Sequence, residues 1–397
     1  MKKGLIAATV AVSACAVVLA GCGSSSLNGG ADEDAYNVVV LGGLSANGVL
    51  ADNASTSVLA AKAGADWANN NGGIDGKDVD LTVIDDEGDP TVAITKLREQ
   101  INKAKPDMVL NSGPSTIADA TLPILNQNDI LSFNIGPSEN SANAAKFPLN
   151  FDLASGPKAQ VNAYIPVMKE KGYKTIGVLH GSSPTGVDFG KAAADVFAAD
   201  FDVVADEGYD TSALDMTPQL QAIRSKNPDV LVLDAYGAPL GYILKGIQKL
   251  GWDVPIMGNL SVSATGLIST PPPSGVLGTD VVKNLTMEVF NSTVYDPDNK
   301  ALSEAVSAMK AKGDIKSTLI LAYNYDVFPL VAAAADEADS TDSKAIAKAL
   351  VSDDVQDSAK TVILKRYHFT AEDHSANTGP EDFQFIEPTE LKDGQFR

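Results

Sequence analysis

Side chains that could perform covalent chemistry are few in this sequence and poorly spaced for it. Only three histidines occur, and none has the spacing of a zinc site or a neighbouring nucleophile and acid. They are His180, His368 and His374. The acids Asp85 and Asp86 are adjacent, so on regular structure their carboxylates point apart. No glycine run completes a dinucleotide or phosphate loop. We expect no enzyme activity, no metal and no cofactor.

One cysteine indicates a different chemistry, the attachment of lipid. Lys2 and Lys3 give a positive start, residues 4–20 are uncharged and mostly apolar, and Leu19-Ala20-Gly21-Cys22 resembles a bacterial lipobox. The resemblance implies a signal peptide over residues 1–21, acyl chains such as palmitate on Cys22, and a flexible tether over 22–35. A plain signal peptide is one alternative. A membrane span, the other, needs roughly 20 apolar residues, more than this core has. We expect an extracytoplasmic protein anchored to the cell membrane.

Two hydroxyl groups lie where a predicted helix begins. Ser115 and Thr116 follow the apolar run Met108-Val109-Leu110 and open a helical pattern. Free backbone N–H groups and the positive end of the helix dipole favour an anion at such a position. Capping of the helix by either hydroxyl explains the same residues without a ligand. From the residues alone, both explanations remain open.

These residues need a rigid sheet behind them, and the apolar pattern predicts one. Short β-branched runs that end in polar or glycine residues alternate with longer helical patterns. The expected strands are 38–41, 79–84, 108–110 and 130–133, and the expected helices are 57–70, 91–103 and 115–126. Continuous apolar runs indicate buried parallel strands, so we predict a βαβ series in a doubly wound sheet.

The same alternation repeats in the second half of the chain. Strands are expected at 175–179, 203–207, 230–233 and 255–257, and helices at 158–171, 186–199, 217–225 and 239–250. After Thr270-Pro271-Pro272-Pro273 only helical patterns follow, at 300–312, 319–338 and 343–351. We predict α/β lobes at 36–155 (lobe 1) and 156–284 (lobe 2). Residues 285–340 are expected to return to lobe 1, and 341–397 to pack mainly on lobe 2 and the hinge.

Length and charge narrow the class of protein. Of the 397 residues, a 21-residue leader leaves enough chain for two domains of about 150 to 200 residues. The net charge is −21, from 51 acidic and 30 basic residues, which argues against nucleic acid as a partner. Cys15 lies in the leader, so the acylated mature chain has no thiol for a disulfide. We expect a monomer stabilised by its cores.

Several short segments, taken in order, resemble the leucine/isoleucine/valine-binding family of ABC-importer substrate-binding proteins in its lipoprotein form. They are residues 40–45, 71–76, 85–90, 113–116 and 130–138. Each is weak alone, and their order and spacing carry the resemblance. It implies the type I periplasmic-binding fold, with two doubly wound Rossmann-like lobes joined by a three-crossover hinge. It also implies a small solute captured in the cleft and passed to an ABC permease and its ATPase.

The resemblance also implies a set of ligand contacts beyond the carboxyl ends of the strands. Ser115 matches the family serine whose hydroxyl holds the ligand carboxylate. Gly136 and Ser138 match a pair that gives a carbonyl acceptor and a donor, and Tyr236 matches a wall tyrosine. The full predicted set is Ser45, Asn53, Ser115, Thr116, Gly136, Ser138, Thr185, Tyr236 and Asn259.

The chain departs from the family pattern where the ligand ammonium should bind. Asn53 and Thr185 replace two tyrosines, and the glutamate that pairs with the ammonium falls near Asn259-Leu260, neither of which carries charge. A buried ammonium without a counter-ion is strongly disfavoured. Either Asp234 substitutes for the glutamate, or it only caps a turn and the ligand is recognised by its carboxylate or amide alone. The second alternative is preferred on sequence.

The function expected from these residues is therefore solute binding. A branched or other aliphatic amino acid, an aromatic or aliphatic carboxylate, and an amide or urea all fit the predicted contacts. A sensory lipoprotein that signals to a partner protein is the alternative. Transport is favoured over it because no membrane helix or output domain follows Arg397.

Overall fold

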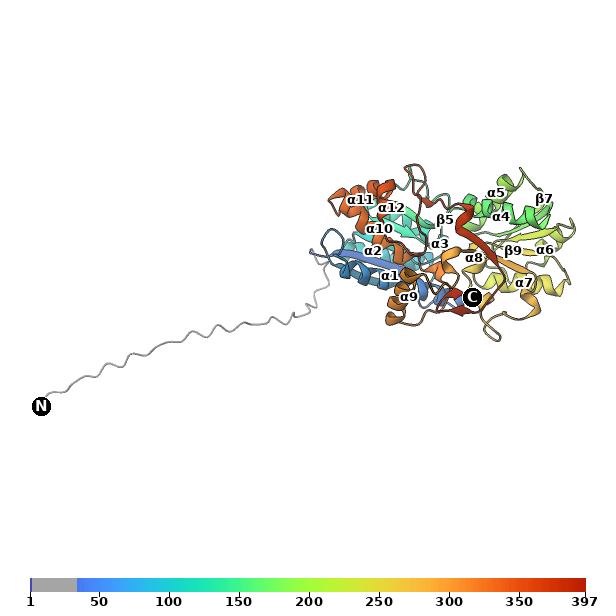
Figure 1. Ribbon diagram of the computed structural model, residues 1–397, viewed down its shortest axis with the longest axis horizontal. Helices are drawn as coiled ribbons and strands as arrows, with labels where there is room; N and C mark the ends of the chain where they lie inside the picture. Colours follow the sequence, from blue (N-terminus) through green and yellow to red (C-terminus); the bar gives the residue numbers. More distant parts are fainter. Residues whose placement is uncertain (2–33) are drawn as a thin grey trace.

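The computed structural model describes Met1 and residues 34–397, so the leader, Cys22 and nearly all of the predicted tether lie outside the described residues. The described chain forms two α/β lobes placed side by side (Figure 1). Among these residues, no helix combines the length and apolar character that a membrane crossing requires.

Lobe 1 is built on a six-stranded parallel sheet of order β11-β5-β4-β3-β1-β2. Its strands are β1 (Tyr36–Gly42), β2 (Val79–Asp85), β3 (Met108–Asn111), β4 (Leu131–Asn134), β5 (Asn150–Ser155) and β11 (Ser375–Ala376). The connecting helices are α1 (Val49–Asn70), α2 (Pro90–Lys103) and α3 (Ser115–Gln127). Along β1, Val38 and Val40 belong to one buried cluster, and Val39 and Leu41 to another. Burial on both faces explains the continuous apolar runs.

Lobe 2 repeats this plan with a six-stranded sheet of order β12-β10-β9-β8-β6-β7. Its strands are β6 (Thr175–Gly181), β7 (Asp202–Tyr209), β8 (Val230–Leu233), β9 (Ile256–Gly258), β10 (Leu285–Phe290) and β12 (Phe383–Ile386). Its helices are α4 (Pro157–Lys171), α5 (Pro184–Phe197), α6 (Thr217–Arg224), α7 (Ala238–Lys249) and α8 (Leu260–Ser263). Only β12 runs antiparallel to its neighbour. The prediction of two doubly wound lobes is confirmed.

The C-terminal third adds helices to lobe 1 and short elements around the hinge. Helices α9 (Lys300–Lys312) and α10 (Tyr323–Ala338) pack on α1, and α11 (Ser343–Leu350) and α12 (Asp353–Ser358) pack on α10. Strands β13 (Leu391–Lys392) and β14 (Gln395–Phe396) form a hairpin. The 3-10 helices are Gly266–Ser269, Asp280–Val282, Asn291–Thr293, Leu319–Leu321 and Pro380–Asp382.

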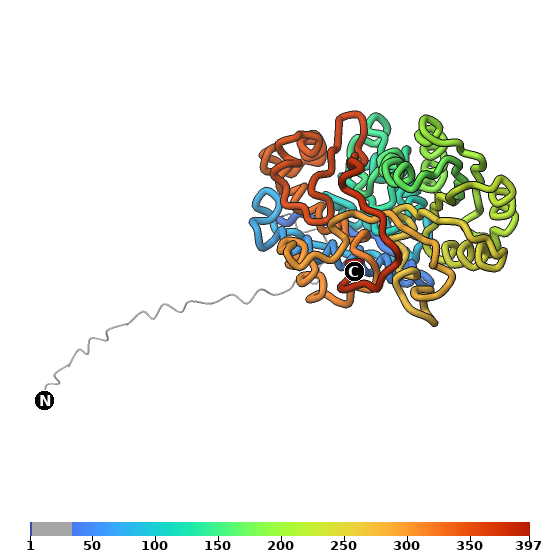
Figure 2. The backbone as a smooth tube through the Cα atoms, turned by 45° about the vertical axis from the view of Figure 1, so that its right-hand side comes forward, coloured from blue at the N-terminus to red at the C-terminus, as the bar shows by residue number. Residues whose placement is uncertain are grey.

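The chain passes between the lobes three times, as the family resemblance implied. The first passage joins β5 to α4, the second joins β10 to α9, and the third joins β11 to β12. Figure 2 shows the last passage as the red segment that runs between the lobes. These adjacent connections form the hinge, and the predicted three-crossover hinge is confirmed.

The expected domain boundaries need two corrections. Residues 285–290 form β10, which pairs with β9 in the second sheet, so they belong to lobe 2 rather than to the return. Residues 343–376 pack on lobe 1, because α11 and α12 cover α10 and β11 pairs with β5. Of the C-terminal segment, β12 alone joins the second sheet. The expected packing mainly on lobe 2 is therefore wrong for most of that segment.

A buried carboxylate fixes the C-terminal segment to α10. Asp326 accepts hydrogen bonds from the backbone N–H groups of Val362, Ile363 and Leu364 at 2.7, 2.9 and 3.1 Å, and from the Tyr367 hydroxyl at 2.7 Å. Burial raises the pKa of Asp326 to about 6, and these four donors oppose the rise. The segment therefore depends on one charged side chain for its local hydrogen bonds.

Candidate functional site

A cavity of about 760 Å³ lies between the lobes. Its volume is within the range of about 300 to 1,000 Å³ that is usual for small-molecule sites. Residues that follow strands and begin helices line it, since the carboxyl ends of both sheets open toward the cleft. First-turn residues in the wall include Val49, Leu50, Ser115, Thr116, Thr185, Ala238, Pro239, Leu260, Ser261 and Tyr323.

One end of the cavity is suited to an anion. Helix α3 begins at Ser115. The backbone of Gly136 packs directly against this first turn, since a Cβ added at Gly136 would be only 2.6 Å from the Ser115 nitrogen. Across the cleft, the backbone N–H of Thr185 in α5 donates to the Ser115 Oγ at 3.2 Å, and the Thr185 Oγ1 donates to the Pro137 carbonyl at 2.6 Å. The N-termini of two helices therefore meet here. Within residues 34–397 the N–H groups of Ser115 and Thr116 in α3 are unpaired, whereas the first-turn N–H groups of α5 are already bonded, so α5 contributes only its dipole.

The Ser115 hydroxyl is not a helix cap. Pro114 occupies the N-cap position and no side chain caps α3, because Ser115 is already the first helical residue. Its hydroxyl accepts the Thr185 N–H and keeps its own proton for another acceptor. The structure thus removes capping by Ser115 or Thr116 as the explanation of these two residues.

An acid in the cavity wall adds the opposite charge. Asp234 is 4% exposed, and its two carboxylate oxygens accept from the Asn259 amide at 2.9 Å and from the Gly181 N–H at 3.1 Å. Within residues 34–397 no cationic side chain pairs with it. A Cβ at Gly186 would lie 2.7 Å from an Asp234 oxygen, so the first turn of α5 packs directly on this acid. The cavity therefore holds a buried acid beside its anion-binding end.

Aromatic and aliphatic side chains form the remaining walls. Tyr236 lines the cavity, and its hydroxyl accepts a 2.8 Å hydrogen bond from the Asn53 amide on the other lobe. Burial raises the pKa of Tyr236 to about 12, so its phenol stays neutral. The other apolar and aromatic lining residues include Leu50, Ile135, Tyr209, Leu260, Leu267, Val276, Ile320 and Tyr323. Such walls suit the carbon skeleton of a small solute.

Five of the nine predicted contacts line the cavity, namely Ser115, Thr116, Gly136, Thr185 and Tyr236. Asp234, which was weighed as a counter-ion, lines it too. That these residues touch a ligand stays a prediction. They lie together because each follows a strand of one sheet or begins a helix facing the cleft.

The other four predicted contacts do not line the cavity. Ser45 is exposed on the loop after β1, where its N–H donates to Asp85. Asn53 is held by Tyr236 and by the Ser317 hydroxyl, which donates to it at 2.6 Å. The Ser138 hydroxyl donates to Asp119 at 2.9 Å. Asn259 caps α8 and donates to Asp234. The side chains of Asn53, Ser138 and Asn259 are thus engaged in hydrogen bonds within the protein, and Ser45 lies on the surface.

The lining residues that were missed include three large polar or aromatic side chains. Gln160 comes from α4, Tyr209 ends β7 and Tyr323 begins α10. None belongs to a recognisable motif. One feature of the sequence could have indicated Gln160. It is a polar residue on the face of α4 that is otherwise buried, one helical turn before Tyr164.

The described residues offer no arrangement for bond chemistry. No group of three His, Cys, Asp or Glu side chains among them is placed to hold a metal ion. His180 Nε2 is 3.6 Å from Asp206 Oδ1, and this pair is not in the cavity wall. His374 stacks on Phe151 with ring centroids 4.1 Å apart. What the cavity offers is hydrogen bonds, the buried Asp234 carboxylate, the exposed Lys245 in its wall and apolar side chains, which are the means of reversible binding.

Comparison with known proteins gives consistent results. The family model described as periplasmic binding protein matches residues 36–385. A curated relative, Leu/Ile/Val-binding protein homolog 3 of Brucella melitensis, is 24% identical over 302 residues, which cover 73% of this chain and 77% of the relative.

Solved structures show the same fold at low sequence identity. A periplasmic binding protein type 1 from Bordetella pertussis has a TM-score of 0.73 and 19% identity, with 92% of this chain and 99% of that chain covered. The substrate-binding protein LivJ of Streptococcus pneumoniae, in complex with isoleucine, has a TM-score of 0.65 and 18% identity, covering 89% and 100%. An ABC transporter solute-binding protein of R. palustris, in complex with 4-hydroxybenzoate, has a TM-score of 0.65 and 19% identity, covering 80% and 84%.

Proposed function

Because the chain belongs to the periplasmic binding protein family, we propose that it captures a small amino acid or a related carboxylate in its interlobe cleft for an ABC importer. Members of the family are solute-binding proteins and not enzymes. The solved relatives in complex with isoleucine and with 4-hydroxybenzoate both hold a ligand with a carboxylate.

The observation that carries this proposal is the position of Ser115 between two helix N-termini. The hydroxyl, the first-turn N–H groups of α3 and the start of α5 converge on the same end of the cavity. A ligand carboxylate there accepts hydrogen bonds from the Ser115 hydroxyl and the α3 N–H groups of lobe 1, and it faces the positive end of the α5 dipole on lobe 2. The ligand thereby favours the closed arrangement, because those contacts exist together only when the lobes meet.

The position of Asp234 supports a zwitterionic ligand. Its carboxylate is buried in the cavity wall, is bonded only to neutral donors, and lies beside the start of α5. Each carboxylate oxygen can accept a second hydrogen bond. We therefore adopt the alternative that was not preferred on sequence, in which Asp234 takes the place of the missing glutamate as partner of the ligand ammonium.

Replacement of Ser115 by alanine is expected to weaken binding of the ligand by about 1 to 3 kcal/mol, because a buried carboxylate oxygen loses its donor. A thermal-shift screen of amino acids, aliphatic and aromatic carboxylates, amides and urea identifies the tightest ligand first, since a bound ligand raises the melting temperature. Calorimetry with that ligand then compares the wild type with Ser115→Ala.

Ser307→Ala is the matched control, because the exposed Ser307 hydroxyl donates to the Ser303 carbonyl within α9 and does not line the cavity. It should bind like the wild type. Unchanged affinity in Ser115→Ala would remove Ser115 from the site. The absence of any stabilising carboxylate in the screen would contradict the proposed function itself.

The finer parts of the proposal concern location and partners. We propose that lipid on Cys22 tethers the protein, as a monomer, to the outer face of the cell membrane beside a permease and its ATPase. The support is the lipobox-like sequence Leu19-Ala20-Gly21-Cys22. Cys22→Ser should move the expressed protein from the membrane pellet to the soluble fraction. Retention of that variant in the pellet would contradict lipid anchoring through Cys22.

A further inference from the structure

The hinge side of the cavity holds a second group of polar atoms that the proposed function does not use. Each atom is buried and makes no hydrogen bond within the described chain. The atoms are Gln160 Oε1, Tyr164 Oη, both carboxyl oxygens of Glu288, and Tyr323 Oη. All four side chains are at least 97% buried. Buried polar atoms are almost always paired, so a cluster of five without partners requires an explanation.

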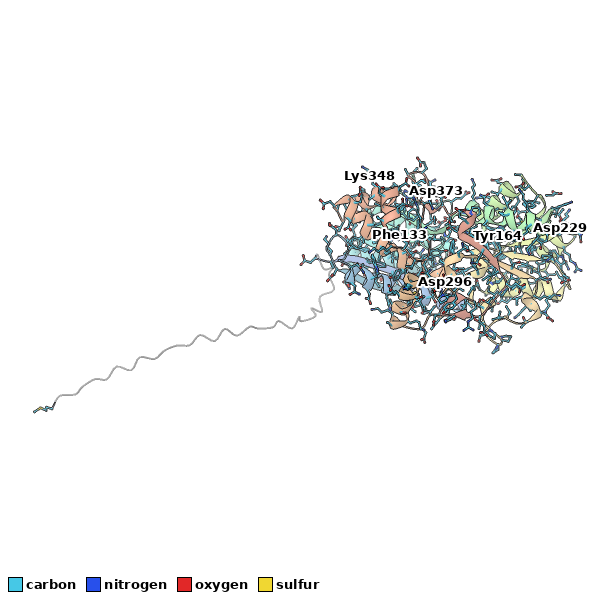
Figure 3. All side chains as sticks on the ribbon, viewed as in Figure 1. Phe133, Tyr164, Asp229, Asp296, Lys348 and Asp373 are labelled. Carbon is cyan, nitrogen blue, oxygen red and sulfur yellow. The ribbon has the colours of Figure 1, made fainter. Side chains whose placement is uncertain are left out.

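Packing brings these four side chains together. Glu288 on β10 pairs in register with Phe385 on β12, and the Tyr164 ring meets the Phe385 ring edge-on at 4.8 Å. Phe290, two residues beyond Glu288 on the same strand face, meets the Tyr323 ring at 5.9 Å. The two phenols therefore flank Glu288. Figure 3 labels Tyr164 beside the red strand β12, the edge strand of the lobe 2 sheet.

This cluster adjoins the cavity. Gln160 and Tyr323 line it, and Gln160 lies one helical turn before Tyr164 on α4. The Glu288 carboxyl lies next to the backbone N–H of Leu260, which is also a lining residue. Gln160 and Tyr323 thus meet the ligand space, and Tyr164 and Glu288 lie buried directly behind them.

The sheet register gives the distance from the first site. Leu233 on β8 pairs with Gly258 on β9, and Gly258 pairs with Met287 on β10. The residues that follow Leu233, Gly258 and Met287 are Asp234, Asn259 and Glu288. Because the three strands are parallel and in register, these residues lie side by side on neighbouring strands. Neighbouring strands are about 4.8 Å apart, which places Glu288 about 10 Å from Asp234. A ligand longer than a simple aliphatic amino acid can therefore extend from Asp234 to the Gln160 and Tyr323 side of the cavity, behind which Glu288 lies.

The chemistry of the cluster combines acceptors with donors, because the two phenols and a protonated Glu288 carboxyl can each donate one hydrogen bond as well as accept. Gln160 offers only its carbonyl oxygen, because its amide already donates to the Ser155 carbonyl at 2.7 Å. Burial raises the pKa of Glu288 well above its usual range, so the carboxyl stays protonated unless a cation faces it. A neutral N–H group is accepted by the Gln160 oxygen and the Glu288 carbonyl oxygen. A cationic group ionises Glu288 and pairs with it.

We propose that Gln160, Tyr164, Glu288 and Tyr323 form a second subsite, which binds a nitrogen-borne hydrogen-bond donor at the end of the ligand remote from its carboxylate. The inference rests on the proposed function and names its substrate class. The preferred solutes are amino acids whose side chains carry an amide, urea-type or cationic nitrogen group, and branched aliphatic amino acids bind more weakly.

Calorimetry with four probes tests this subsite. L-leucine has no remote nitrogen, L-glutamine and L-citrulline carry neutral N–H groups, and L-arginine carries a cation. At least one nitrogen-bearing probe should bind tenfold or more tightly than leucine. Preference for arginine indicates that Glu288 ionises, and preference for glutamine or citrulline indicates that it stays protonated.

Two variants separate recognition from folding. Glu288→Met and Tyr323→Phe each remove only unpartnered oxygen atoms, so their melting temperatures should not fall below that of the wild type. In each, the affinity ratio of the best nitrogen-bearing probe to leucine should fall at least tenfold. Glu170→Met makes the same change at an exposed position of α4 and should leave the ratio unchanged.

The outcomes distinguish the two proposals. If leucine binds as tightly as every nitrogen-bearing probe, or if both variants keep the wild-type ratio, the second subsite is wrong while amino-acid binding stands. If none of the four probes binds, amino-acid binding is wrong as well. A wild-type preference that both variants abolish supports the subsite.

Discussion

Asp234→Asn is expected to weaken binding of a zwitterionic amino acid by roughly thirtyfold to several thousandfold. The change removes one partner of a buried charge pair, which costs about 2 to 5 kcal/mol. Asparagine keeps the shape of the side chain and can still accept one of the two hydrogen bonds from Gly181 and Asn259. Calorimetry with the tightest amino acid from the thermal-shift screen measures the loss.

Two controls make this result specific. Asp195→Asn removes the same charge from an exposed position of α5 and should leave the affinity unchanged. The desamino analogue of the ligand, which has no ammonium, should bind Asp234→Asn at least as tightly as the wild type. If the amino acid binds the variant with full affinity, the ammonium does not pair with Asp234, and the site recognises its ligand through the carboxylate end alone.

Asp326→Ala is expected to lower the free energy of unfolding by about 3 to 5 kcal/mol. The variant leaves four donors without an acceptor in the interior: three consecutive backbone N–H groups of residues 362–364 and the Tyr367 hydroxyl. Such groups lose their hydrogen bonds without regaining water. Urea unfolding followed by circular dichroism measures the change.

Asp336→Ala is the matched substitution on the exposed face of the same helix. It should shift stability by no more than about 0.5 kcal/mol. If both variants unfold at the same urea concentration as the wild type, the Asp326 network contributes nothing to stability. Ligand binding should survive in Asp326→Ala at low temperature, since Asp326 does not line the cavity.

The strands with both faces buried could be predicted from sequence. In the run 38–41, alternate side chains point into different hydrophobic cores, so every position is apolar. Such a continuous apolar run predicts a buried strand directly. The same holds for 230–233 on β8, where all four residues are buried. Each of these strands is followed within a few residues by a helix, which is why the strand-end loops were expected in the right place.

The C-terminal elements could not be predicted in this way. Strand β11 has two residues, and it pairs with β5 more than 200 positions earlier in the chain. Strand β12 has four, and most of its side chains are only partly buried. Such short segments carry no periodic signal, and the hinge passages bring them to their partners. Their placement depends on long-range packing that a local pattern does not contain.

The candidate site was foreseen only in part for a related reason. Ser115 and Gly136 follow strands of lobe 1, so topology alone directs them to the cleft. Gln160 and Tyr323 begin or belong to helices that reach the cavity only through the folded hinge. Asn53 has the right position along the chain, but its amide is used by Tyr236 and Ser317. Sequence pattern predicts where a residue lies, and competing partners decide what it binds.

The hydrogen bond from Asn53 to Tyr236 has a consequence for selectivity. It joins the two lobes directly and forms without a ligand. It therefore contributes the same free energy to the equilibrium between the open and closed forms whichever solute is bound. Altering it rescales the affinity for all solutes by a common factor and leaves their ranking intact. Substitution of Asn53, which lies outside the cavity wall, can therefore change the overall affinity of the protein without changing which solutes it prefers.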